Sequence, residues 1–191
     1  TIDAWCFDLI SSFPILADIQ VPALPDWTTS KAYHVAAARA SRSSAVQRML
    51  ACSYEALLVD EYQDCQKTQH EAILAMAEAI PTAVFGDELQ CLFHFGHNSP
   101  VDWMTDVVPH FPDLPIDSEP WRWKGHNEDL GTWLLGIRDA LFTSQPIDLN
   151  TAPVTWIPMS PIAAVQACHS MMNESGTAAA LGHFRSDCID V

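Results

Sequence analysis

The sequence predicts an α/β fold in which a parallel sheet is flanked by helices. Residues 57–59 form a short apolar run that is followed at once by Asp60 and Glu61. Residues 83–85 form a second apolar run, which is followed closely by Asp87. The segment between the two runs has the apolar spacing that is typical of an amphipathic helix. Two apolar strands joined by a helix indicate a β-α-β unit, with its acids at the carboxyl edge of the sheet.

The part of the chain before the first strand is expected to be helical. A helix is predicted over residues 4–12, because Trp5, Leu9 and Phe13 recur at helical spacing. Three prolines then indicate a loop, since proline interrupts helical hydrogen bonding. The alanine-rich segment that follows predicts a single helix over residues 31–52.

The helix between the two strands is expected over residues 66–80. Ile73, Ala77 and Ile80 lie on one face of such a helix, and Pro81 ends it. This helix would cover the sheet and return the chain to the start of the second strand.

A change of composition predicts two domains. Residues 100–120 contain five prolines and are the expected seam between them. The predicted division is therefore 1–115 and 116–191. The second domain is expected to contain, in order, a helix over 127–142, a strand over 154–157, a helix over 162–172 and a strand over 178–184.

The loops after the two strands resemble motifs of superfamily 1 DNA helicases of the UvrD/Rep type. The Walker B element of that family reads D-E-x-Q-D, and residues 60–64 read D-E-Y-Q-D. The family's next motif reads G-D-x-x-Q, and residues 86–90 read G-D-E-L-Q. Residues 1–6 are similar to its T-x-H-S-F segment, with Asp3 in place of the histidine. Residues 119–123 are similar to the N-Y-R-S segment that opens the second motor domain.

The resemblance implies a RecA-like fold of the P-loop NTPase type. Residues 1–115 would form most of the first motor domain, and residues 116–191 the beginning of the second. The sequence contains no G-x-x-x-x-G-K-[ST] phosphate loop. We therefore expect the central segment of a longer helicase, or a short UvrD-like remnant, and we expect this chain alone to be inactive.

The resemblance also assigns roles at the two strand ends. ATP is the implied substrate and Mg²⁺ the implied metal, held by Asp60 and Glu61. Glu61 would also polarise the attacking water. Gln63 and Gln90 would sense the γ-phosphate, because an amide can hydrogen-bond to a phosphate oxygen and release it after hydrolysis.

Other candidates follow further along the chain. Phe93 and Phe95 lie where the family stacks bases of single-stranded DNA, although Phe93 could instead pack in the core. Trp121 occupies the position of the tyrosine that stacks on adenine, and Arg122 that of an arginine that reaches the γ-phosphate. Gly96 stands where the family has an arginine that links the ATP and DNA sites, which puts their coupling in question.

Two functions remain open from the sequence. The first is an ATP-dependent 3′-to-5′ DNA helicase or translocase in the cytoplasm, acting on single-stranded DNA. The second is a non-catalytic UvrD-like remnant that binds a partner protein, such as a nuclease. The net charge of −15 is unusual for a DNA-binding protein, since affinity for DNA depends on neutralising phosphates. No run of eighteen apolar residues is present, so no membrane span is expected in this sequence.

Overall fold

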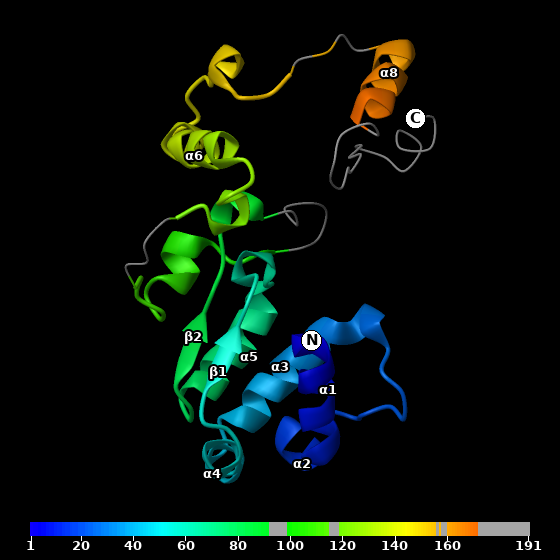
Figure 1. Ribbon diagram of the computed structural model, residues 1–191. Helices are drawn as coiled ribbons and strands as arrows, with labels where there is room; N and C mark the ends of the chain where they lie inside the picture. The colour runs from blue at the N-terminus through cyan, green and yellow to red at the C-terminus, as the bar shows by residue number, and fades with distance from the viewer. Residues whose placement is uncertain (92–98, 115–118, 156, 158–159, 172–191) are drawn as a thin grey trace. The chain divides into compact units, whose positions relative to one another are not determined.

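The computed structural model divides into two compact units, Thr1–Ile116 and Asp117–Val191. Its described residues are those outside 92–98, 115–118, 156, 158–159 and 172–191 (Figure 1). No helix of the described residues is long and apolar enough to cross a membrane.

The first unit combines five α-helices and two strands in its described part. The helices are α1 (Ile2–Ser12), α2 (Pro14–Ala17), α3 (Ser30–Ser41), α4 (Ser44–Ser53) and α5 (Lys67–Ala77). The strands are β1 (Leu57–Val59) and β2 (Thr82–Val84). Short 3₁₀ turns are η1 (Trp27–Thr29), η2 (Tyr62–Asp64) and η3 (Glu88–Gln90), and a π-type turn is η4 (Trp103–Val107).

The two strands are parallel neighbours, and α5 lies between them in the chain (Figure 1). Leu57 pairs with Thr82, and Val59 pairs with Val84. The predicted β-α-β unit is therefore confirmed, and the first unit is an α/β structure. The described sheet has two strands.

The core of the first unit lies where α3 packs against α1 and α5 (Figure 1). Alanines give α3 a narrow profile, so neighbouring helices can approach it closely. The fully or almost fully buried residues of the three helices include Cys6, Leu9, Ile10, Ala36, Ala37, Ala40, Ala72, Ile73 and Met76. This packing fixes α5, and with it the end of the loop between β1 and α5.

The single helix predicted over 31–52 is wrong, because the structure has α3 and α4 in its place. The chain breaks at Ser43, whose backbone is extended. The Ser43 hydroxyl accepts a hydrogen bond from the backbone N–H of Val46 at 3.3 Å and so caps α4. Serine favours this position because its side chain satisfies an amide that the helix cannot.

The second unit contains α6 (Glu128–Gly136), α7 (Arg138–Phe142) and α8 (Pro161–Met171). Its 3₁₀ turns are η5 (Trp121–Trp123) and η6 (Leu149–Thr151). The one helix predicted over 127–142 is thus two helices that meet at Ile137. The strand predicted over 154–157 is wrong for its described residues, which have no strand structure. The strand predicted over 178–184 lies outside the described residues.

Candidate active site

The loop after β1 presents two exposed acids, Asp60 and Glu61. The Asp60 carboxylate accepts a hydrogen bond from the backbone N–H of Glu61 at 2.9 Å. Glu61 itself has left-handed backbone angles, φ 52° and ψ 43°. That conformation costs about 1–2 kcal/mol for a residue other than glycine, so it persists only where neighbouring contacts impose it.

Gln63 joins this loop to the loop after β2. Its side chain is only 4% exposed. Nε2 donates a hydrogen bond to Glu61 Oε2 at 2.6 Å, and Oε1 accepts one from the backbone N–H of Asp87 at 3.0 Å. The amide therefore has a defined orientation, with its two ends bound to the two motif loops. Sequence reasoning placed Gln63 at the site without foreseeing this bridge.

The approach of the two loops explains the residue at position 86. A Cβ atom on Gly86 would lie 2.7 Å from Gln63 Oε1 and 3.0 Å from Cζ3 of Trp103. The first distance is shorter than real Cβ contacts and the second is tighter than most of them, so a side chain there would displace the buried amide. Glycine is required at position 86 by close approach.

Gln90 lies in η3 on the second loop, and its side chain is exposed. Its Nε2 donates a hydrogen bond to Asp87 Oδ2 at 2.8 Å, while Asp87 Oδ1 accepts one from the backbone N–H of Leu89 at 3.1 Å. Asp87 thus orders the turn and holds Gln90 on the loop that follows β2.

Tyr62 is a residue of the site that sequence reasoning missed. It is fully buried, and its hydroxyl lies 2.7 Å from Nδ1 of His70 on α5. Its backbone N–H donates to the carbonyl of Phe85 at 2.8 Å, which extends the pairing of the two strands. The only sequence signal is an aromatic residue at the variable position of D-E-x-Q-D, and nothing local marks His70 as its partner.

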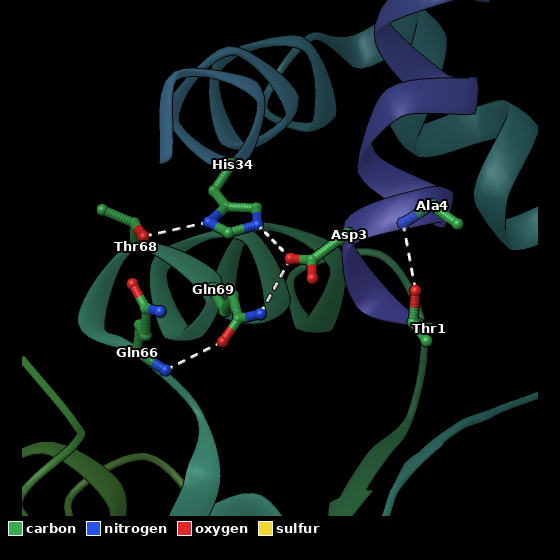
Figure 2. A network of polar contacts seen from close by, with 7 residues as sticks. All are labelled: Thr1, Asp3, Ala4, His34, Gln66, Thr68 and Gln69. Carbon is green, nitrogen blue, oxygen red and sulfur yellow. Dashed lines mark hydrogen bonds and ion pairs between the residues drawn. The ribbon is translucent and has the colours of Figure 1, made fainter. Parts of the chain in front are cut away.

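A second buried histidine ties the start of the chain to α3 and α5 (Figure 2). His34 is 1% exposed, and its Nε2 meets the Asp3 carboxylate at 2.5 Å. Its Nδ1 lies 3.0 Å from the Thr68 hydroxyl. Gln69 also donates to Asp3, at 2.9 Å (Figure 2). The aspartate that replaces the family's histidine is therefore paired with a histidine from another helix.

Two further predicted site residues belong to the second unit. Trp121 and Arg122 belong to η5 of the second unit, and both are exposed. The Trp121 ring is 67% exposed, and Lys124 Nζ lies 4.1 Å from its centroid. Phe93, Phe95 and Gly96 lie outside the described residues.

The acids fit a magnesium ion that is bound together with a nucleotide. Among the described residues, no group of three or more His, Cys, Asp or Glu side chains is arranged to hold a metal by itself. Mg²⁺ is usually held by one or two carboxylates plus substrate phosphates and water, rather than by a complete protein cage. The adjacent, exposed carboxylates of Asp60 and Glu61 supply that kind of ligand.

The fold and these loops define an α/β protein that carries carboxylates and amides at the carboxyl ends of two parallel strands. Residues 27–105 match the family model for the UvrD/REP helicase N-terminal domain. Both motif loops lie inside this range, so the match confirms the resemblance of this part of the chain to a UvrD-type helicase. No curated protein and no solved structure matches the chain.

Proposed function

We propose that the chain is part of the motor of an ATP-dependent 3′-to-5′ DNA helicase or translocase. Its first unit would supply the hydrolytic side of an ATP site in a RecA-like domain. The observation that supports this most strongly is the Gln63 bridge, because it ties Glu61 to the loop after β2 through one buried amide.

The proposed chemistry is attack of water on the γ-phosphate of ATP. Mg²⁺ would neutralise charge on the phosphates. Asp60 would hold the ion, and Glu61 would accept a proton from the attacking water. Gln63 keeps the Glu61 carboxylate oriented through the bond to Oε2. Gln90, exposed on the loop that follows β2, would bind the γ-phosphate and report its loss.

The other residues would complete the cycle. Trp121 would stack on adenine, and Arg122 would stabilise the charge of the transition state when the motor domains close. Phe93 and Phe95 would stack on bases of single-stranded DNA, an interaction that contributes about 1–3 kcal/mol per base.

The alternative, a UvrD-like protein-interaction module, is favoured by a different observation. An apolar groove runs beside β1 and is lined by residues that include Ile2, Trp5, Tyr54 and Leu58. Leu58 is 68% exposed. A partner protein such as a nuclease could cover this groove, and the net charge of −15 is compatible with a protein partner.

Replacement of Glu61 by glutamine in the complete protein tests the proposed function. Glu61→Gln should leave ATP affinity near the parent's and lower kcat by about 100- to 10,000-fold, because an amide cannot act as the general base. The control is Glu88→Gln, which makes the same change at an exposed acid of the neighbouring loop. An unchanged kcat in Glu61→Gln would remove Glu61 from the mechanism. A parent without DNA-stimulated ATP hydrolysis would favour the interaction module.

A further inference from the structure

A buried tyrosine–histidine pair joins the proposed catalytic loop to α5. Tyr62 follows Glu61 in the chain and is 0% exposed, while His70 on α5 is 5% exposed. Their hydrogen bond is 2.7 Å long, and their rings meet edge to face with centroids 5.9 Å apart. Phe111 packs against both rings and closes the cluster on another side.

The chemistry of the pair gives its hydrogen bond one direction. Burial raises the pKa of the Tyr62 hydroxyl, which therefore keeps its proton and donates it. Burial and the nearby His110 lower the pKa of His70, so its Nδ1 is free to accept. A neutral imidazole with Nδ1 as the acceptor carries its proton on Nε2.

The hydrogen bond to His70 holds Tyr62 in place, and Tyr62 in turn helps to keep Glu61 in its left-handed conformation. The left-handed conformation of Glu61 is held on one side by the bond from its N–H to Asp60. On the other side it is held by Tyr62, whose backbone N–H is bound to the Phe85 carbonyl and whose side chain is bound to His70. A backbone strain of this kind persists only while such contacts constrain it.

We propose that His70 is a positioning residue for Glu61, acting through the Tyr62 hydroxyl. The inference rests on the proposed role of Glu61 in ATP hydrolysis. Because neither Tyr62 nor His70 is exposed, the pair acts on the geometry of the loop rather than on ATP itself. Its loss should therefore lower kcat and leave the KM for ATP close to the parent's.

Two substitutions at position 70 separate hydrogen bonding from packing. His70→Leu fills the space but removes the acceptor. His70→Asn retains an acceptor, because the amide oxygen of asparagine lies near the place of Nδ1. In the complete protein, His70→Leu should lower kcat about 10- to 100-fold, as expected for a misplaced catalytic group. His70→Asn should restore most of this loss.

Tyr62→Phe tests the other partner by removing a single oxygen atom. It should lower kcat as His70→Leu does, and the double variant should be no slower than either single variant, since both remove one interaction. The matched control is Tyr33→Phe. Tyr33 is also buried, and its hydroxyl accepts a bond from the backbone N–H of Asp26 in another loop. This control should keep the parental kcat even if its melting temperature falls.

The outcomes distinguish this inference from the function on which it rests. If Glu61→Gln abolishes turnover while His70→Leu and Tyr62→Phe leave kcat unchanged, the positioning role is wrong and the proposed function stands. Equal losses in His70→Leu and His70→Asn would also overturn it, because the acceptor would then be irrelevant. If Glu61→Gln turns over ATP normally, Glu61 is not part of the mechanism and the positioning role falls with it. A parent that does not hydrolyse ATP would mean that the proposed function itself has failed. If His70→Leu does not fold, Tyr62→Phe alone decides.

Discussion

Gly86 and Gln63 lie so close together that a Cβ atom on the glycine would come within 2.7 Å of the amide oxygen. This oxygen is buried and already accepts the backbone N–H of Asp87. The two motif loops are thus packed against each other at one glycine, and the geometry of the first depends on the size of a residue in the second.

Gly86→Ala should therefore destabilise the first unit and disturb the amide bridge. Overpacking of this kind costs about 1–3 kcal/mol, and denaturant unfolding measures it. The control is Gly136→Ala, because a Cβ atom at Gly136 would meet nothing within 4 Å. Alanine is a better helix former than glycine, so the control should be neutral or stabilising. Equal stability of Gly86→Ala and the parent would show that the loops can move apart freely.

The Asp3–His34 contact predicts a stability effect where α1 and α3 meet the start of α5. Asp3→Ala would leave the buried His34 ring and the Gln69 amide without their shared acceptor. Removing one partner of a buried hydrogen bond costs about 1–3 kcal/mol. Asp3→Asn keeps an acceptor oxygen and should cost less. Asp8→Ala, at an exposed site of the same helix, should change stability by about 0.5 kcal/mol or less.

His70 predicts a pH dependence of stability. Its folded-state pKa is lowered from the ordinary value of 6.5, chiefly by burial and then by His110. Asp106, Glu71 and Lys67 are the charged groups that also act on it. As the pH falls below 6.5, the unfolded chain takes up the proton before the folded chain does. The stability contributed by neutral His70 is full above that pH and is lost below it.

His70→Asn should flatten this part of the pH dependence, because asparagine does not titrate. Melting temperatures of the parent and of the variant, measured from pH 8 to about pH 5, give the comparison. The difference between them should be nearly constant above pH 6.5 and should shift in favour of the variant below it. Parallel curves over the whole range would mean that the pKa of His70 is the same in the folded and unfolded chain.

The sequence predicts those parts of the structure that depend on local signals. The strands around Leu58 and Ala83 were predicted because each is a continuous apolar run that ends on an acid. The breaks at Ser43 and Ile137 were missed, since apolar spacing continues across both. A capping serine in an alanine-rich segment is a weak signal, and the packing of the neighbouring helices decides whether the chain turns there.

The candidate site also has features that the sequence predicts and features that it misses. The sequence predicts four residues of the site, because the two motifs fix their spacing along the chain: Asp60, Glu61, Gln63 and Gln90. The sequence does not predict two of the buried contacts, because each joins side chains from different elements. These are the contacts of Tyr62 with His70 and of Asp3 with His34. Such pairs depend on how the helices pack, which the linear pattern does not determine.

Two tryptophans of the η5 turn, Trp121 and Trp123, allow the proposed nucleotide contact to be separated from packing. Trp121 is 67% exposed, so Trp121→Ala should change the melting temperature little. If its ring stacks on adenine in the complete protein, the variant should bind ATP roughly 5- to 100-fold more weakly. Its kcat should be nearly unchanged, because stacking acts about equally on the ground state and the transition state.

Trp123→Ala is the matched control, because Trp123 packs against α6 whereas Trp121 is exposed. A Cβ atom on Gly131 of α6 would lie 2.7 Å from the Trp123 Cβ, so the turn and the helix are in close contact. Trp123→Ala should therefore lower stability by about 2 kcal/mol and leave ATP affinity intact at temperatures where the unit is folded. Nucleotide titrations and melting curves on both variants give the answer. Normal ATP affinity in Trp121→Ala would remove this tryptophan from the proposed nucleotide site.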